Sequence, residues 1–466
     1  MAATVIKKES SKQLLAALPE LVAQLLAAEE EEPCPPYQGA EELTRLFDLS
    51  VPECGLDHSD LIELLRKVIL ATPRTATPAF VNQLYGGRLW PATLAEMLTA
   101  MLNNSMYTFK VAGLQILIEE QVIAEMLRLA GLTRGEGIFC PGGSISNLVA
   151  MLAARHFALP EARENGLHRS APLRVYASDQ AHYSITKNAG ILGYGRHNVR
   201  LIPTDENGRM NTDLLAAAVA EDRRNGCFPV LVVATAGTTV LGAFDPIPEI
   251  LEITQRFGLW LHVDAALGGG FLFHPEHRGR LAGVEAADSV TWNPHKMLGV
   301  PLSASVVLFA RKGTLAENLS EAADYLFQED DADLNPGLRS IQCGRRNDAL
   351  KVWAAMQYLG KEGLCRRVEL QLALARFAAL EISKDPAFEL ALPPASLTVC
   401  FRLRGADSPA LAHALNEQGL AKISWASFRG QTFLRLACVN PDMTEEDLRA
   451  LLRNIKYAGE RQQNAH

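Results

Sequence analysis

Short apolar runs alternate with helical stretches through the middle of this chain, and no other feature constrains its fold as strongly. Such alternation is typical of a mainly parallel sheet that is covered by helices on both faces. Thr212–Arg224 and Ile247–Phe257 are examples of the helical stretches. The sequence therefore predicts an α/β fold whose binding residues gather beyond the carboxyl ends of the strands. The strand candidates are Leu173–Ala177, Val199–Ile202, Val230–Ala234, Leu259–Val263, Ser289–Trp292 and Ser305–Phe309.

The region before this alternation contains helical patterns and no strand pattern. We expect helices over Leu14–Ala28, Ser59–Ala71 and Ala92–Leu102, and a loop over the acidic and proline-rich Glu29–Pro36. A longer helix is predicted over Val111–Ala130. A helical arm without strands of its own often packs on something else, and a partner subunit is one candidate. We assign residues 1–104 to this N-terminal arm.

The C-terminal region mixes helical and strand patterns. Asp348–Leu380 and Thr444–Tyr457 have the pattern of helices, whereas Leu397–Leu403 and Phe433–Ala437 have that of strands. The sequence therefore predicts a large α/β domain over residues 105–355 and a smaller α+β domain over residues 356–466.

Composition and charge exclude several classes of protein. The chain has 466 residues, of which 48% are hydrophobic and 21% charged, a globular profile with a sizeable core. The formal net charge of −8 argues against a general nucleic-acid binder and against attachment to acidic membranes by charge. The 8 cysteines form no Cys-x-x-Cys pair, which indicates free thiols in a reducing compartment, so we expect a cytoplasmic protein. We expect neither a signal peptide nor a membrane span.

A lysine and an aspartate at two predicted strand ends give the strongest chemical signal. The segment Asp288-Ser-Val-Thr-Trp-Asn-Pro-His295-Lys296 places the lysine beyond one strand, where an isolated His-Lys pair would usually be a surface turn. Asp264 ends another apolar strand, and a carboxylate there is costly unless a cation or strong donor pairs with it. A protonated pyridine nitrogen is such a partner, and the charged ring accepts electrons. A helix N-cap or a structural ion pair would also account for Asp264.

Further segments would complete a site for a phosphorylated ring. Cys140-Pro-Gly-Gly143-Ser144-Ile-Ser146-Asn147 precedes a helix, whose free N–H groups and approachable backbone suit a phosphate. It lacks the lysine of a P-loop, so it does not indicate a nucleotide triphosphate site. His182, just beyond a strand, could lie flat on an aromatic ring. The hydroxyls of Val233-Ala-Thr-Ala-Gly-Thr-Thr239 follow another strand, although this pattern alone is typical of an ordinary turn.

A metal site is an alternative for some of the same residues. His262, Asp264 and His295 could supply ligands, and the first two share a strand face. The surrounding run is apolar, and no further ligand follows at the spacing of metal sites. We therefore expect no metal.

Several motifs carry a family resemblance: Phe80-Val-Asn-Gln-Leu, Gly137-Ile-Phe-Cys-Pro-Gly-Gly-Ser-Ile-Ser-Asn, Gly237-Thr-Thr-Val-Leu-Gly-Ala-Phe-Asp-Pro, His262-Val-Asp-Ala-Ala, Trp292-Asn-Pro-His-Lys, and Tyr325-Leu-Phe-Gln with Ile341-Gln-Cys-Gly-Arg-Arg. From about Ala79 to Asn440 the chain resembles the group II amino-acid decarboxylases that depend on pyridoxal 5'-phosphate (PLP). These enzymes have the aspartate-aminotransferase fold, called fold type I. The branch of cysteine-sulfinate, aspartate and glutamate decarboxylases resembles the chain most.

The resemblance implies a role for each residue of the site. Lys296 would carry PLP as a Schiff base, Asp264 would hold the ring nitrogen, and His182 would stack on one ring face and act in catalysis. Arg435 would bind the α-carboxylate of the substrate. The family also implies a homodimer with shared active sites. The other implied cofactor residues are Gly143, Ser144 and Asn293 at the phosphate, Ala266 on the second ring face, Thr235 near the ring, and His295 beside the lysine.

Departures from the family pattern concern the substrate. Residues 83–88 read Gln-Leu-Tyr-Gly-Gly-Arg, and Tyr85 resembles the aspartate and cysteine-sulfinate branch more than the glutamate branch. Lys110 and Gly113 stand where relatives usually have Glu and Pro. In the loop Gln328–Arg339, Leu334 replaces a tyrosine that protonates the carbanion in many relatives, so the proton would come from His182 or water. The substrate residues are predicted to be Gln83, Tyr85, Ser105, Tyr107, Leu334 and Arg435.

The predicted reaction is α-decarboxylation of a short acidic amino acid: aspartate, a β-substituted aspartate such as 3-methylaspartate, or cysteine sulfinate. One alternative is an aspartyl-type unit tethered to an acyl carrier protein, which Arg88, Lys110 and the loop would meet. Transamination or oxidative deamination on the same fold is another, because fold alone does not decide the reaction. An inactive PLP-binding homologue is the third.

Overall fold

Seven strands form the central sheet of the computed structural model, which describes residues 8–167, 171–321 and 334–463. The strands are ordered β1-β7-β6-β5-β4-β2-β3. β3, β2, β4, β5 and β6 are parallel, whereas β7 runs antiparallel to β6 and β1. The predicted α/β fold with a mainly parallel sheet is confirmed. The bounds are β1 Glu136–Cys140, β2 Leu173–Ser178, β3 Val199–Ile202, β4 Phe228–Thr235, β5 Trp260–Ala265, β6 Ser289–Trp292 and β7 Ser305–Phe309.

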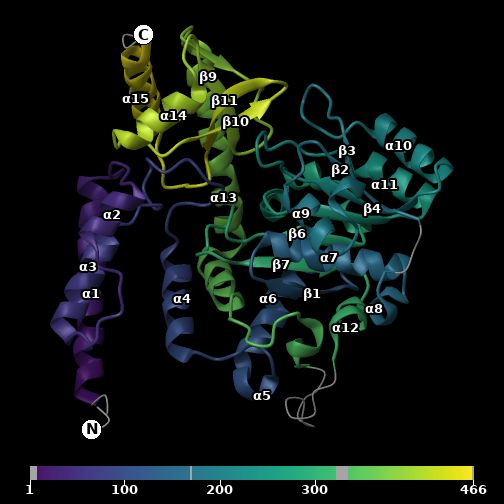
Figure 1. Cartoon of the computed structure of the whole chain (residues 1–466), viewed down its shortest axis with the longest axis horizontal. Coiled ribbons are helices and arrows are strands. Elements are labelled where there is room, and N and C mark those ends of the chain that lie inside the picture. Colours follow the sequence, from purple (N-terminus) through teal and green to yellow (C-terminus); the bar gives the residue numbers. More distant parts are fainter. Residues whose placement is uncertain (1–7, 168–170, 322–333, 464–466) are drawn as a thin grey trace.

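Helices cover both faces of this sheet (Figure 1). Alternate residues of β4 show the two layers: Leu231 and Val233 pack with α7 and α9, whereas Val232 and Ala234 pack with α6, α10 and α11. Because both faces are buried, the strand sequences are continuously apolar, and this is why their positions could be predicted. The bounds are α6 Leu114–Ala130, α7 Gly143–Ala158, α9 Ser184–Ile191, α10 Thr212–Arg224 and α11 Ile247–Phe257.

The N-terminal segment is helical, as predicted. α1 and α3 pack side by side along the edge of the molecule (Figure 1). The predicted loop over Glu29–Pro36 is wrong in its first residues, because α1 continues to Glu31. Glu29 accepts hydrogen bonds from both terminal nitrogens of Arg88, and this ion pair holds the last turn of the helix. The bounds are α1 Lys8–Glu31, α2 Ala40–Leu46, α3 His58–Ala71 and α4 Trp90–Leu102.

The long helix predicted over Val111–Ala130 is interrupted. Gly113 has φ 51° and ψ −121° and separates α5, Phe109–Ala112, from α6. This conformation is open to glycine and closed to other residues, so the chain changes direction here although the apolar pattern continues.

A four-stranded antiparallel sheet forms the C-terminal layer, in the order β10-β11-β9-β8. It packs with α14 and α15 beyond one end of α13 (Figure 1). α13, Ala349–Lys384, continues through the expected division between residues 355 and 356 and bends at Gly360. The smaller α+β part is confirmed, although β8, β10 and α14 were not predicted. The bounds are β8 Phe388–Leu390, β9 Thr398–Leu403, β10 Ser424–Phe428, β11 Gln431–Ala437, α14 Ser408–Glu417 and α15 Glu445–Gln463.

Shorter elements connect these layers. None of the helices in the described ranges combines the length and the apolar character that crossing a bilayer requires. The short elements are α8 Ala162–Asn165, α12 Thr314–Leu319, and the 3₁₀ turns η1 Arg196–Asn198, η2 Gly268–Phe273, η3 Arg278–Leu281, η4 Val284–Ala286 and η6 Pro336–Arg339.

Candidate active site

A cavity of about 220 Å³ lies at the carboxyl edge of the central sheet. Parallel strands end at the same edge, so residues that follow β2, β4, β5 and β6 meet there although they are far apart in sequence. All predicted cofactor residues line this cavity: Gly143, Ser144, His182, Thr235, Asp264, Ala266, Asn293, His295 and Lys296. Asn147, Tyr183, Gly237 and Thr239 line it as well.

Lys296 enters the cavity from the turn that follows β6. Burial lowers the pKa of its amine; the Asp264 carboxylate opposes this shift, and the Arg435 guanidinium reinforces it. A lowered pKa increases the fraction of neutral amine at a given pH. Since only the neutral amine attacks a carbonyl, the position suits a Schiff-base lysine.

Asp264 lies at the end of β5 and its side chain is buried. Its Oδ2 accepts a hydrogen bond of 2.8 Å from Nδ2 of Asn147, and its Oδ1 accepts one of 3.1 Å from the backbone N–H of Ala266. These donors are neutral, so they orient the carboxylate without balancing its charge. A buried carboxylate that lines a cavity is well placed to receive a cationic ring nitrogen.

The start of α7 lies in the Lys296 cavity, at the place where the sequence predicts a phosphate cradle. A Cβ on Gly143 would lie 2.7 Å from Nδ2 of Asn293, so only glycine leaves room at this point. Ser305 Oγ donates a hydrogen bond of 2.6 Å to Oδ1 of Asn293, which turns the amide nitrogen of Asn293 toward Gly143. Free N–H groups in the first turn of α7 add donors for an anion.

His182 and Thr235 complete the walls of the cavity. The Nδ1 of His182 lies 2.8 Å from Oγ of Ser184, and its ring centroid lies 4.3 Å from that of Tyr183. Burial lowers the pKa of His182, so the ring is neutral at neutral pH. Thr235 Oγ1 is buried and has no hydrogen-bond partner in the described parts of the chain. An unsatisfied hydroxyl that lines a cavity indicates a ligand with a complementary polar atom.

The residues present fit PLP in four respects. The cavity holds an amine with a lowered pKa, a buried carboxylate without a cation, a cradle that only glycine permits, and an unpartnered hydroxyl. These features match the aldehyde, the ring nitrogen, the phosphate and a polar atom near the ring. The fold and site together define a PLP enzyme of fold type I.

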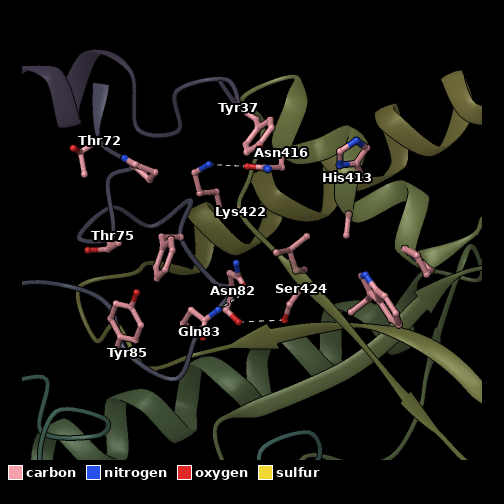
Figure 2. A pocket seen from close by; sticks show the side chains of 16 residues that line it. Tyr37, Thr72, Thr75, Asn82, Gln83, Tyr85, His413, Asn416, Lys422 and Ser424 are labelled. Carbon is pink, nitrogen blue, oxygen red and sulfur yellow. Dashed lines mark hydrogen bonds between the residues drawn. The ribbon is translucent and has the colours of Figure 1, made fainter. Parts of the chain in front are cut away.

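Three predicted substrate residues lie around a neighbouring cavity of about 650 Å³ or beside it. Gln83 and Tyr85 line it, as Figure 2 shows. Arg435 on β11 donates hydrogen bonds to Oγ of Ser424 and to the backbone oxygens of Thr239 and Asn82. Thr239 lines the Lys296 cavity and Asn82 lines the larger one, so the guanidinium lies between the two.

None of the six predicted substrate residues lines the Lys296 cavity within one chain. Ser105 Oγ donates to the backbone oxygen of Cys343, and the carbonyl of Tyr107 accepts a bond of 2.9 Å from Gly337. Leu334 precedes this segment and is partly exposed. These residues are therefore held to residues 334–345 rather than to the strand ends. Tyr325 and residues 328–333 lie outside the described residues.

Arg88 and Lys110, the basic residues expected to meet a carrier protein, do not line the Lys296 cavity. Arg88 is committed to its bidentate pair with Glu29. Lys110 is exposed on α5 and does not line the Lys296 cavity. Arg88 lines a separate cavity of about 320 Å³ that His295 also lines.

The network behind Asp264 was not predicted. Asn147 and His262 stood in the quoted motifs without such a role, and Ser184 and Ser289 carried no signal. The sequence pattern after β4 is, taken alone, typical of an ordinary turn. In the structure Thr235, Gly237 and Thr239 all line the Lys296 cavity. The alternative of a metal site required a free ring nitrogen on His262. Its Nδ1 lies 2.9 Å from Oγ of Ser289, and its Nε2 lies 3.1 Å from Oδ1 of Asn147, so both nitrogens are engaged.

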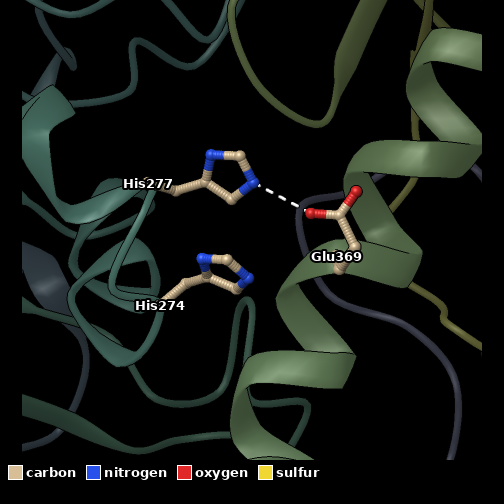
Figure 3. Close-up of side chains that lie close together, drawn as sticks. All are labelled: His274, His277 and Glu369. Atoms are coloured by element: carbon tan, nitrogen blue, oxygen red, sulfur yellow. Dashed lines mark hydrogen bonds and ion pairs between the residues drawn. The ribbon is translucent and has the colours of Figure 1, made fainter.

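A second histidine cluster lies outside this cavity. Potential ligand atoms of His274, His277 and Glu369 lie within 4.8 Å of one another, and Nε2 of His277 lies 2.9 Å from Oε2 of Glu369 (Figure 3). The Nδ1 of His274 accepts a hydrogen bond of 3.2 Å from the backbone N–H of Glu276. Arg376 pairs with the other oxygen of Glu369. Because these groups occupy the ligand atoms and add positive charge, we assign no metal here.

Comparisons with known proteins identify the family. A family model described as the pyridoxal-dependent decarboxylase conserved domain matches residues 40–404. Cysteine sulfinic acid decarboxylase of Mus musculus is 38% identical over 446 residues, which cover 91% of this chain and 90% of that protein. Acidic amino acid decarboxylase GADL1 of Bos taurus is 39% identical over 445 residues, covering 91% and 85%. The crystal structure of mouse CSAD has a TM-score of 0.90 and 35% identity, covering 95% of this chain and 99% of that one.

The chain belongs to the pyridoxal-dependent decarboxylase family. It is a PLP-dependent carboxy-lyase, and the predicted enzyme class and cofactor are confirmed.

Proposed function

We propose that this enzyme removes the α-carboxyl group of a short acidic amino acid and releases the amine and carbon dioxide. The substrates that we consider are aspartate, a β-substituted aspartate such as 3-methylaspartate, and cysteine sulfinate. The observation that carries the proposal is the position of Arg435 between the Lys296 cavity and the larger cavity. Its positive charge is close enough to Lys296 to help lower the pKa of that amine. A fixed guanidinium there suits an anionic substrate.

Each residue of the cavity has a proposed task. PLP, when bound, supplies an electron-accepting ring joined to the substrate amine. Lys296 would hold PLP through its amine, and the Asp264 carboxylate would stabilise positive charge on the ring nitrogen. Gly143, Ser144 and Asn293 hold the phosphate end, and His182 and Ala266 flank the ring.

Arg435 has donors left for a carboxylate. A guanidinium has five N–H groups, and three of those on Arg435 bind Ser424, Thr239 and Asn82. The remaining N–H groups, one on each terminal nitrogen, have the geometry of a bidentate contact. We propose that these two N–H groups bind a carboxylate of the substrate. It is either the acidic side chain, which does not react, or the α-carboxylate, whose position orients the α-carbon over the ring.

The proton that replaces the carboxyl group needs a donor. Leu334 has no exchangeable proton, so the tyrosine used by many relatives has no counterpart at this position. The neutral His182 ring lines the cavity and carries one N–H. We propose that this N–H holds a water molecule in the cavity, through which a proton from solvent reaches the α-carbon.

The relatives support an acidic side chain in the substrate. One relative is named for cysteine sulfinic acid and another for acidic amino acids, and each of the two alignments covers 91% of this chain. Tyr85 packs against Phe80 with ring centroids 5.7 Å apart and the rings tilted by 48°. Tyr85 also lines the larger cavity, where it would limit the length of the substrate side chain.

We further propose a homodimer whose subunits complete each other's sites. Ser105 and Tyr107 lie away from Lys296 within one chain, so a substrate role would require a second chain. Large apolar side chains are exposed on helices α4 and α6, which both pack on α13, and such exposure is typical of a subunit interface. They are Trp90, Leu94, Leu98, Met101 and Leu102 on α4, and Leu114 and Leu117 on α6. All 8 cysteines are free thiols, which fits the proposed cytoplasmic location.

The proposal is tested by offering the purified enzyme a panel of amino acids and identifying products by mass spectrometry. The panel contains aspartate, 3-methylaspartate, cysteine sulfinate, glutamate and aromatic amino acids. We expect an amine lighter by one carbon dioxide from a short acidic substrate. A keto acid or an aldehyde would instead indicate transamination or oxidative deamination. No product from any free acid, in protein that carries PLP, would contradict the proposal and favour a tethered substrate or an inactive homologue.

A further inference from the structure

Strand β5 and helix α7 enclose a buried polar network behind the cavity. Side chains alternate along a strand, so Trp260, His262 and Asp264 lie on the same face of β5. Trp260 packs in the core layer that contains α7, which shows that this face is turned toward the helix. Asn147, one turn into α7, lies in the same layer and is buried.

Asn147 contacts three polar partners. Its Nδ2 donates to Oδ2 of Asp264 at 2.8 Å and to Oγ of Ser184 at 3.1 Å. Its Oδ1 lies 3.1 Å from Nε2 of His262. One amide therefore uses both of its N–H groups and its oxygen on groups of the site wall.

The Asp264 carboxylate fixes the direction of the Asn147 amide. A carboxylate only accepts hydrogen bonds, so the nitrogen of Asn147 must face Asp264 and its oxygen must face His262. The Nε2 of His262 must then carry the proton that this oxygen accepts. Burial lowers the pKa of His262 to about 4, so the ring is neutral at neutral pH and has no second proton.

The directions of the hydrogen bonds beyond His262 are fixed in the same way. With its proton on Nε2, His262 must accept at Nδ1, where Oγ of Ser289 lies 2.9 Å away. Ser289 therefore donates to His262, and its oxygen accepts the 2.9 Å bond from Nε1 of Trp260. An indole N–H only donates, so this end of the network is fixed as well.

The other branch reaches His182. Ser184 Oγ accepts from Asn147 and lies 2.8 Å from Nδ1 of His182, and the backbone N–H of Ser184 donates to the same nitrogen at 3.3 Å. The Nδ1 of His182 is therefore an acceptor, and the proton of its neutral ring is on Nε2. This is the N–H that would hold the proton-delivering water.

We propose that Asn147 is the positioning residue that joins the two cofactor-facing side chains, Asp264 and His182, by imposing one proton arrangement on the network from Trp260 to His182. This inference rests on the proposed place of PLP between these two residues. Asn147 acts through its neighbours: it holds the carboxylate of Asp264 toward the ring nitrogen and keeps the N–H of His182 on Nε2.

The test compares PLP with a carbocyclic analogue in which C–H replaces the ring nitrogen. Full-length protein is freed of cofactor and titrated with each ligand, and binding is followed by protein fluorescence. In Asn147→Leu we expect PLP to bind about 10-fold to 100-fold more weakly, the scale of one hydrogen bond to a charged group. The analogue cannot pair with Asp264, so its affinity should change little. The wild-type preference for PLP over the analogue should therefore fall by the same factor.

Asn188→Leu is the matched control. Asn188 is also a buried asparagine, but its Nδ2 donates to the backbone oxygen of Ser144 at the phosphate cradle. We expect this variant to weaken PLP and the analogue equally, because both carry the phosphate. Equal weakening of both ligands by Asn147→Leu would reduce Asn147 to a structural residue and overturn the inference. Wild-type protein that binds neither ligand would overturn the proposed site itself.

A second measurement needs no variant of Asn147. In holoenzyme labelled with ¹⁵N-histidine, His182 and His262 should both show a protonated Nε2 and an unprotonated Nδ1, with signals assigned from His182→Gln and His262→Gln. A proton on Nδ1 of either ring would overturn the inference even if Asn147→Leu failed to fold.

Discussion

The two halves of the active site are built differently. The cofactor half is assembled by a single chain, because the ends of β2, β4, β5 and β6 and the start of α7 converge on one cavity. The substrate half is divided: Gln83 and Tyr85 line a second cavity, whereas Ser105 and Tyr107 are bonded to residues 337–345.

The difference follows from how each half is held. Strand-end residues are fixed by the sheet, whose backbone bonds and two apolar layers leave little freedom. Gln83, Tyr85, Ser105 and Tyr107 lie on connections between helices, where position depends on neighbouring segments, whereas Arg435 lies on β11 of the C-terminal sheet. A family can therefore keep its cofactor chemistry constant while loops and subunit contacts change the substrate.

The largest expected effect is in the cofactor half. Lys296→Ala should lower turnover by roughly 10⁴-fold or more, the scale seen when a covalent nucleophile is removed. Borohydride should then no longer fix PLP to the protein, as mass spectrometry of the intact chain would show. Lys312→Ala, an exposed lysine after β7, should keep both turnover and labelling. Normal turnover by Lys296→Ala would contradict the assignment.

The second prediction tests whether the substrate half crosses between subunits. Lys296→Ala and Tyr107→Ala are each expected to be inactive, and their subunits are mixed, dissociated and reassociated. Random pairing makes half of the dimers mixed, and each mixed dimer has one intact site, so about one quarter of wild-type activity should return. If Tyr107 acts within its own chain, mixing should restore nothing.

The same contrast explains what the sequence could and could not predict. Strands buried on both faces are continuously apolar, so β2 to β7 were placed nearly at their observed bounds, and Asp264 and Lys296 stood out as polar residues at their ends. β10 alternates small and exposed residues at a sheet edge, and the break at Gly113 lies within an unbroken apolar pattern. The bond between Asn147 and His262 depends on how α7 packs across β5, which no local pattern encodes.

The third prediction concerns acid stability of the cofactor half. His262 has a pKa of about 4 in the fold, against an ordinary value of 6.5, because it is buried. Between these two pH values the unfolded chain binds a proton that the folded chain does not, so stability falls as the pH falls through this window. The effect is about 3 kcal/mol, a net value in which the Asp264 carboxylate already offsets part of the shift caused by burial.

Urea unfolding of His262→Gln and wild type at pH 7, 6, 5 and 4 measures this difference. The variant should lose less stability over the window than the wild type does. His413→Gln, which changes an exposed histidine on α14, should follow the wild-type curve. Parallel curves for His262→Gln and wild type would show that His262 does not resist protonation.

The fourth prediction probes the boundary between the two halves. Arg435→Lys keeps the charge but cannot make a bidentate contact, and it leaves Asn82 or Thr239 with an unpaired backbone oxygen. We expect KM for the acidic substrate to rise about 10-fold to 100-fold, with a smaller change in kcat. Arg402→Lys on β9, whose partner is Glu389, is the control and should leave KM unchanged. A fall in kcat at constant KM would place Arg435 outside substrate binding.

The smallest effect is expected at the start of α7, where two glycines are compared. At Gly143 a side chain would come too close to Asn293, whereas at Gly142 it would strain the backbone. In Gly143→Ala the new Cβ would meet Nδ2 of Asn293 at 2.7 Å. Ser305 holds the other end of that amide, so Asn293 must shift as a whole. Overpacking of about 1 kcal/mol would raise the dissociation constant of PLP roughly fivefold.

Gly142→Ala provides the comparison one residue earlier. A Cβ on Gly142 would meet no atom within 4 Å, but the backbone has φ +98°, which L-residues rarely adopt. This variant should therefore lower the Tm of the cofactor-free protein, whereas Gly143→Ala should mainly weaken PLP binding. If both variants lowered Tm and left PLP affinity unchanged, the start of α7 would be needed for folding alone, and the phosphate would have to be held elsewhere in the cavity.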